Sequence, residues 1–204
     1  EDAIHDASQA IAAHSASKSE QEGMGATCAC VWILERKLYI AYVGDSRIYL
    51  VRGGHIRRLT KDHTWVQEAI EKGIITPEQA HDHPNVHVIR RHLGSVELPD
   101  VDFRLYLEEG EEDQVARDNQ GLDLEAGDIL LLCSDGLTDL IWDDEILKTL
   151  RSKPDLKSAT ETLVEMANQR GGHDNVTTVL LSVPREGEVI KKKKGLVDWL
   201  FGDG

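Results

Sequence analysis

Three aspartates lie at the ends of apolar, strand-like runs, each beside a glycine or an asparagine: Asp45, Asp135 and Asp174. A carboxylate that closes a buried strand costs free energy unless a cation, an arginine or several backbone donors stabilise its charge. Three such residues are typical of a strand-end site for Mg²⁺ or Mn²⁺, because these ions prefer carboxylate oxygens and water as ligands. The plainer interpretation is that each aspartate caps a turn or a helix, which Asp135 and Asp174 could both do.

The elements that would carry the first aspartate are short strands separated by turns. Before them, residues 2–18 place apolar side chains at helical spacing and predict an amphipathic helix. Four β-rich runs then follow, at 26–34, 37–43, 46–52 and 55–59. Strand, turn and strand at this rhythm are typical of an antiparallel meander.

A histidine-rich insert follows the fourth run. Asp62 and Thr64 can start a helix that Gly73 ends, and Thr76 can cap a second helix that has Pro77 at its first position. The insert holds five of the nine histidines of the chain, namely His63, His81, His83, His87 and His92.

The second half of the chain combines strands with helices. Strands are predicted at 101–107, 122–124, 128–133 and 176–183, and helices at 143–150 and 159–169. We interpret the acidic stretch 108–121 as a solvated hairpin, with partner docking as the alternative.

Composition and charge exclude several classes of protein. The chain has 204 residues and a net charge of −14, which suit one sizeable domain and disfavour general nucleic-acid binding. The longest apolar run, 129–133, is far shorter than the roughly 18 residues of a membrane span, and no secretory signal is visible. We interpret Cys28, Cys30 and Cys133 as small buried hydrophobes in a reducing, cytoplasmic compartment, with a metal site at the first two as the lesser alternative.

Four short strings, in fixed order and at characteristic intervals, carry a resemblance to a known family. They are GMGAT at 23–27, VGDSR at 43–47, LCSDGL at 132–137 and GHDNVT at 172–177. Together they resemble the metal-dependent protein phosphatases of the PPM, or type 2C, family. The insert, with TPEQA at 76–80, HP at 83–84 and IRRHLG at 89–94, is similar to the flap of the bacterial branch.

The resemblance implies a fold and a chemistry. The fold would be α+β, a four-layer α-β-β-α sandwich of two antiparallel sheets with helices outside. The chemistry would be hydrolysis of phosphoserine or phosphothreonine in proteins by a metal-bridging water, without a phosphoenzyme. The cofactor would be Mg²⁺ or Mn²⁺, with two ions, or three in a complete domain.

The resemblance also implies a role for individual residues. Asp135 and Asp174 would bind the central ions, and Asp45 would pair with Asp135 at a third, weaker site. Ser134 and Asn175 would orient these carboxylates.

The flap, at about residues 60–95, would lie on the substrate side, where His83, Arg90 and Arg91 are the candidate contacts. Its histidines could titrate near neutrality or contact phosphopeptides, or they could simply be exposed side chains of a mobile insert. Arg47 is expected to support its strand end. The expected partners are phosphorylated proteins of Ser/Thr kinase signalling, or a regulatory phosphoprotein of the sporulation type, and not nucleic acid.

The sequence also departs from the family pattern. The family carries an upstream segment with a phosphate-gripping Arg, a Glu-Asp pair and an Asp-Gly-Met-Gly-Gly string, none of which occurs here. The sequence also lacks an initiator Met, and residues 1–18 resemble the helix that follows this string in the family. The resemblance therefore implies that the sequence begins inside the first helix of a longer chain, after two opening strands. The domain at 1–184 would then lack its first strands and could self-associate through exposed strand edges.

Two further expectations follow from this departure. The chain alone should bind Mn²⁺ poorly and have little activity, and the alternative function is an inactive, phosphatase-like binding module, or a fragment that another segment completes. Residues 185–204, with four consecutive lysines, are interpreted as a basic tail or linker that could lie near a membrane or bind a partner.

Overall fold

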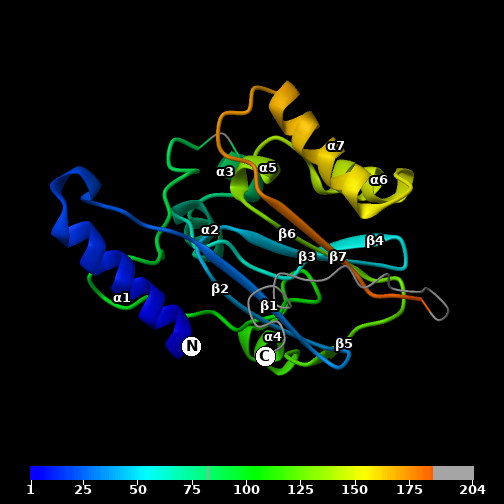
Figure 1. Cartoon of the computed structure of the whole chain (residues 1–204), viewed down its shortest axis with the longest axis horizontal. Helices are drawn as coiled ribbons and strands as arrows, with labels where there is room; N and C mark the ends of the chain where they lie inside the picture. Colours follow the sequence, from blue (N-terminus) through cyan, green and yellow to red (C-terminus); the bar gives the residue numbers. More distant parts are fainter. Residues whose placement is uncertain (82, 186–204) are drawn as a thin grey trace, which may run out of the picture.

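Alternating apolar residues build two antiparallel sheets in the computed structural model, which describes residues 1–81 and 83–185 (Figure 1). The first sheet has the order β1-β2-β5 and consists of β1 (Cys28–Leu34), β2 (Lys37–Val43) and β5 (Leu122–Asp123). The hairpin between β1 and β2 is in register from Cys28 opposite Val43 to Leu34 opposite Lys37. Its turn places Glu35 at a positive φ of 59°.

The second sheet contains the strands next to Asp135 and Asp174, because β6 ends shortly before Asp135 and β7 begins shortly after Asp174. It has the order β4-β3-β6-β7, and all its neighbouring strands run antiparallel. Its members are β3 (Arg47–Arg52), β4 (His55–Arg58), β6 (Ile129–Cys133) and β7 (Thr178–Ser182). The central pair β3 and β6 therefore comes from segments about eighty residues apart in the chain.

The prediction of one continuous meander is wrong, because β2 and β3 belong to different sheets. The chain crosses between the sheets at Gly44, whose φ is +105°. A Cβ at this position would lie 2.4 Å from the side chain of Thr27, so the crossing requires glycine on steric as well as conformational grounds. Asp45 follows directly and is therefore placed at the crossing.

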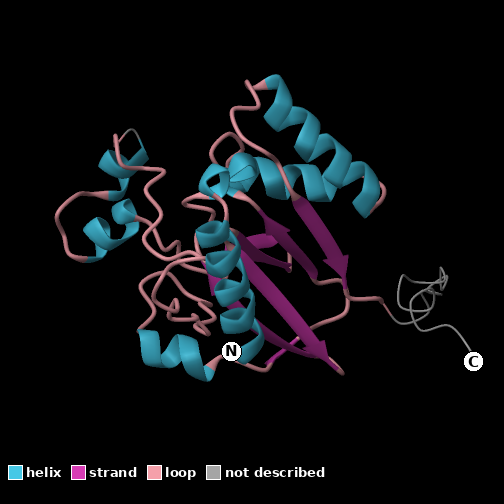
Figure 2. Ribbon diagram, turned by 60° about the vertical axis from the view of Figure 1, so that its left-hand side comes forward, coloured by secondary structure: helices cyan, strands magenta, loops and turns pink. Residues whose placement is uncertain are grey.

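Two sheets with helices outside give the four-layer sandwich that was predicted (Figures 1 and 2). The two sheets enclose a core that includes Leu38, Ile40, Ile48, Leu50 and Leu130. On the outer face of the second sheet, α6 (Asp143–Ser152) and α7 (Leu156–Gln169) bury Ile146 and Leu163. On the other side, α1 (Asp2–Ser17) packs Ile4 and Ile11 near β1 and β2.

The predicted helices of the insert are present and project away from the sheets (Figure 2). Helix α2 (Trp65–Glu71) begins after Thr64, whose side chain accepts a hydrogen bond from the backbone N–H of Gln67. Helix α3 (Pro77–His81) begins after Thr76, which exchanges hydrogen bonds with Gln79 as a capping box. Shorter elements complete the chain: the 3-10 turn η1 (Ser19–Gln21), α4 (Asp113–Asp118) and α5 (Asp135–Thr138).

Two predictions for the acidic middle of the chain are wrong. Residues 101–107 form only one isolated bridge to β2, between Tyr42 and Asp102, and the stretch 108–121 contains helix α4 instead of a hairpin. The reason is visible at Gln120, whose side-chain amide accepts from the N–H of Ile40 and donates to its carbonyl. One side chain thus satisfies the backbone groups of β2 that a neighbouring strand would otherwise pair.

The cysteines and the sheet edges also differ in part from expectation. Cys133 is buried as predicted, but Cys28 is half-buried and Cys30 is exposed. Both lie on the edge strand β1, and of the two only Cys28 packs against the apolar cluster that includes Ile4 and Ile11 of α1. Trp32, on the same strand, is 69% exposed. In the described part of the chain, no helix has the length and apolar character needed to cross a membrane. The predicted basic tail falls almost wholly outside the described residues.

Candidate metal centre

Asp45 is the most deeply buried of the three predicted metal ligands. It is 7% exposed and lies where the chain crosses between the two sheets. Burial raises the pKa of Asp45 to about 6, and the negative charges of Asp135 and Asp62 add to this rise. Its charged form is therefore disfavoured in the chain without an added cation.

Asp135 lies at the first position of α5, immediately after Ser134. Its carboxylate accepts a hydrogen bond of 2.8 Å from the N–H of Gly136, which leaves further oxygen lone pairs free for a ligand. The negative charge of Asp135 is one of the causes of the raised pKa of Asp45.

Ser134 joins the loop of Asp135 to the loop of Asp174. Its hydroxyl donates to the carbonyl of Asn175 at 3.0 Å and accepts from the N–H of Thr177 at 3.0 Å. A Cβ on Gly136 would lie 2.6 Å from the same Asn175 carbonyl, so the close approach of the two loops requires glycine. Ser134 thus links the two loops through backbone groups, to which Asn175 contributes its carbonyl, and its expected role of orienting the carboxylates stays a prediction.

Asp174 lies on the surface and lines the same cavity as Gly136. One of its carboxylate oxygens accepts from the N–H of Asn175 at 2.6 Å. This contact reaches only the next residue, whereas an aspartate that caps a turn accepts from the residue two positions on, and the second carboxylate oxygen has no such partner within the described residues.

Two residues that were not predicted join the site. His87 of the flap and Asp139 of the segment after α5 form, with Asp135, a group whose candidate ligand atoms all lie within 4.8 Å of one another. The Nδ1 atom of His87 is 3.4 Å from Asp139, and burial followed by the charge of Asp135 raises the pKa of Asp139. Asp139 could have been found from its spacing of four residues after Asp135, which is one helical turn. No comparable signal distinguishes His87 from the other flap histidines.

The predicted flap contacts have partners within the chain. His83 stacks on Trp65, with ring centroids 4.6 Å apart. Arg90 lies 3.7 Å from Glu68, and Arg91 lies 3.2 Å from Asp100. None of the three is among the residues that line the cavity beside the candidate centre.

This cavity lies between the flap and helices α5 and α6 and has a volume of about 820 Å³. Its walls combine apolar side chains with acids, histidines and arginines, including Val66, Ile70, Trp142, Asp139, Asp143, His87, His173, Arg47 and Arg58. Arg47 makes a bidentate ion pair with Asp62 at 2.7 Å, which fits its expected role of supporting the strand end. Burial would raise the pKa of Asp62, but the charges of Arg47 and Arg58 outweigh it and keep this pKa below its ordinary value.

The chemistry of the donors fits a hard divalent cation. Asp45 and Asp135 form no ion pair with lysine or arginine anywhere in the described residues, although Arg47 is only two residues from Asp45. Carboxylate oxygens with neighbouring water are the ligands that Mg²⁺ and Mn²⁺ prefer, and a flap imidazole is compatible with Mn²⁺.

Comparisons with known proteins find similarity to protein phosphatases. The family described as Protein phosphatase 2C matches residues 1–70. The chain is 37% identical over 182 residues to the serine/threonine protein phosphatase PstP of Mycobacterium tuberculosis, covering 89% of this chain and 32% of PstP. It is 38% identical over 164 residues to the protein phosphatase PhpP of Streptococcus pneumoniae, covering 80% of this chain and 60% of PhpP. The chain thus spans a third to three fifths of these two relatives.

A solved structure gives the same result at the level of the fold. The catalytic domain of PstP in complex with two manganese ions superposes with a TM-score of 0.69 at 36% identity, covering 87% of this chain and 67% of that domain.

Proposed function

Because this chain belongs to the protein phosphatase 2C family, we propose that it hydrolyses phosphoserine and phosphothreonine in proteins with the help of Mg²⁺ or Mn²⁺. The observation that carries this proposal is the group formed by Asp135, Asp139 and His87, whose candidate ligand atoms all lie within 4.8 Å of one another. Asp139 and His87 line the cavity, and Asp135 forms no ion pair with lysine or arginine within the described residues.

Individual residues would share the work at this site. Asp135 and Asp174 would hold the central ions, and Asp45 would hold a further ion together with Asp135. When bound, divalent ions of this kind make a coordinated water acidic and neutralise the charge of a phosphoryl group. Ser134 would keep the loops of Asp135 and Asp174 at a fixed separation through its two hydrogen bonds.

The substrates would be phosphorylated proteins, which is also what the names of the relatives imply for those proteins. A phosphorylated side chain would enter the cavity between the flap and α5. The acids on the cavity wall would repel a phosphate group when no divalent cation is bound. Substrate binding should therefore depend on the cation.

The test measures turnover and cation binding on the full 204-residue chain. Release of phosphate from a phosphothreonine peptide and from p-nitrophenyl phosphate is followed at millimolar Mn²⁺, and Mn²⁺ binding is followed by calorimetry. Asp135→Asn should lower turnover by about a hundredfold or more, since it removes a direct ligand. The matched control is Asp6→Asn, an exposed carboxylate of α1, which should behave as the unchanged chain does.

Three outcomes are informative. Turnover that survives both chelation and Asp135→Asn contradicts the proposal. Mn²⁺ binding without turnover supports the alternative of an inactive binding module. Turnover that appears only when a further segment of the protein is added supports the alternative of a fragment completed by another segment.

A further inference from the structure

The flap is closed at its base by two backbone hydrogen bonds. The N–H of Trp65 donates to the carbonyl of Val88 at 2.8 Å, and the N–H of Arg90 donates to the carbonyl of His63 at 2.7 Å. The insert between them therefore begins and ends at one narrow neck, and His63 is one of the residues that form it.

His63 also holds the crossing turn that carries Asp45. Its backbone N–H donates to the carbonyl of Gly44 at 3.0 Å, and the N–H of Gly44 donates to its Nδ1 at 3.0 Å. The imidazole is 6% exposed and stacks on Tyr42, with ring centroids 5.2 Å apart. One buried residue is thus bonded to the metal-site turn on one side and to the flap on the other.

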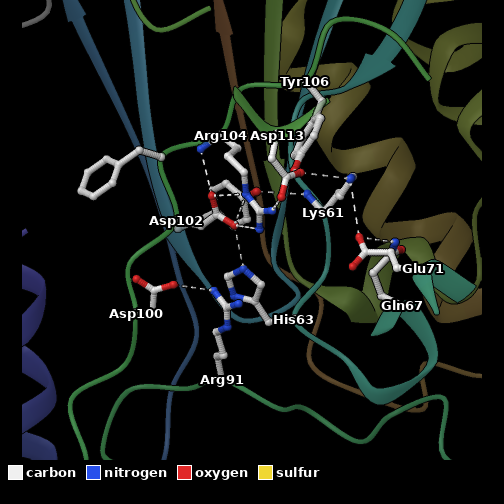
Figure 3. Close-up of polar contacts among 12 residues, drawn as sticks. Lys61, His63, Gln67, Glu71, Arg91, Asp100, Asp102, Arg104, Tyr106 and Asp113 are labelled. Atoms are coloured by element: carbon white, nitrogen blue, oxygen red, sulfur yellow. Dashed lines mark hydrogen bonds and ion pairs between the residues drawn. The ribbon is translucent and has the colours of Figure 1, made fainter. Parts of the chain in front are cut away.

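The hydrogen bonds determine the tautomer of this imidazole. A backbone N–H can only donate, so Nδ1 must be the acceptor, and the ring proton must be on Nε2. Nε2 lies 3.2 Å from a carboxylate oxygen of Asp102 and donates to it (Figure 3).

Asp102 is itself held by a guanidinium. Arg104 donates to both carboxylate oxygens and continues to Asp113 at 2.6 Å (Figure 3). Burial would raise the pKa of Asp102, but the hydrogen bonds from Arg104 and His63 outweigh it and hold this pKa well below its usual range. Asp102 therefore stays ionised and fixes the ring of His63 in the tautomer that accepts from Gly44.

We propose that His63 is a positioning residue. In its Nε2–H tautomer, it holds the turn that carries Asp45 and the neck of the flap in fixed positions relative to each other. The hydrogen bonds of His63 do not depend on whether the chain is an active enzyme. Its effect on cation binding, in contrast, rests on the proposed role of Asp45 as a ligand. Because the same residue serves both segments, loosening its ring should loosen the turn and the neck together.

The test separates the two sides of the ring with a pair of substitutions. His63→Asn places an amide oxygen at the Nδ1 position, which keeps the acceptor for Gly44 and loses the contact with Asp102. His63→Gln places an amide nitrogen at the Nε2 position, which keeps Asp102 and loses the acceptor. The control is His55→Gln, at an exposed position of β4. All variants are compared by hydrogen exchange of residues 44–47 and 88–91, and by the Mn²⁺ concentration that gives half of the maximal activity.

The two substitutions should give different results. With His63→Gln, we expect exchange in both segments and the half-activating Mn²⁺ concentration to rise about tenfold, because a buried N–H is left without an acceptor. With His63→Asn, both quantities should stay within about threefold of the unchanged chain, since that acceptor is kept. A purely structural role would instead lower thermal stability in both variants without separating them, and equal effects overturn the proposal.

A measurement on the unchanged chain completes the test. Nitrogen-15 NMR of the His63 ring should report a protonated Nε2 and an unprotonated Nδ1, and the opposite tautomer overturns the proposal whether or not the variants fold. If the chain shows no turnover, the proposed function fails, but the exchange and ring measurements still decide the role of His63.

Discussion

Removing the charge of Asp45 should raise the free energy of unfolding of the metal-free chain. The same change should reduce the stabilisation that the chain gains from binding Mn²⁺. Asn has nearly the same shape as Asp, so Asp45→Asn changes the charge with little effect on packing. The carboxylate is 7% exposed and forms no ion pair with lysine or arginine in the described part of the chain, while the negative charges of Asp135 and Asp62 act on it. Folding without a cation must therefore bear the cost of this charge at neutral pH.

The cost follows from the pKa. Burial raises the pKa of Asp45 from 3.8 to about 6, which corresponds to about 3 kcal/mol of unfavourable free energy once the group is ionised in the folded chain. Between these two pH values the folded chain binds a proton that the unfolded chain has released, so stability falls as the pH rises through this window. Asp45→Asn should thus gain about 3 kcal/mol, or roughly 10 °C in Tm, at pH 7.5 and almost nothing below pH 4.

The assay is urea denaturation of the chain and of Asp45→Asn at pH 4 and pH 7.5, with a chelator present. The control is again Asp6→Asn, whose exposed carboxylate should leave stability nearly unchanged. The order should reverse when Mn²⁺ is added at pH 7.5, because the cation stabilises the unchanged chain more than the variant. Equal stability of the two chains at pH 7.5 with chelator would refute the argument from uncompensated charge, and a missing reversal would refute the assignment of Asp45 as a ligand.

Three further predictions concern the loops, the thiols and the open sheet edge. Gly136→Ala should destabilise the chain by about 1–3 kcal/mol in urea denaturation and weaken Mn²⁺ binding, because its Cβ would meet the Asn175 carbonyl at 2.6 Å; wild-type values for both would show that the loops can separate freely. Cys30 should react first with a maleimide in peptide mass spectrometry, while Cys133, whose pKa burial raises to about 12, should react only on unfolding, and early labelling of Cys133 would contradict its burial. Trp32→Lys on the exposed face of β1 should reduce any self-association seen by analytical ultracentrifugation, and an unchanged sedimentation profile would locate that contact elsewhere.

Strand and helix positions were largely predictable, because they follow from the periodicity of apolar residues. The run predicted at 37–43 coincides with β2, and the helix predicted at 2–18 ends within one residue of α1. The assignment of strands to sheets was not predictable in this way. It depends on tertiary contacts, such as the close approach of Thr27 to Gly44, which periodicity does not encode.

The candidate site was predictable where chain position alone determines geometry. Asp45 and Asp135 were predicted as ligands because each follows an apolar, strand-like run. The strands that adjoin them, β3 and β6, pair with Arg47 opposite Cys133. His87 was missed because its place beside Asp139 depends on how the flap docks. The role expected for Arg91 illustrates the same limit, since a sequence gives a charge but not the carboxylate, here Asp100, that the charge will meet.

The distribution of arginines supports the assignment of the metal centre more strongly than any single aspartate does. Asp62, which is partly buried, and Asp102, which is fully buried, have pKa values below the ordinary range, because arginine side chains donate to both. Asp45 is also buried, yet Arg47, two residues away, turns to Asp62 and leaves Asp45 with a raised pKa. A fold that only had to bury these acids could have paired Asp45 in the same way. The charge of Asp45 is thus only partly offset in the folded chain, and a divalent cation bound by Asp45 would convert this cost of folding into binding free energy.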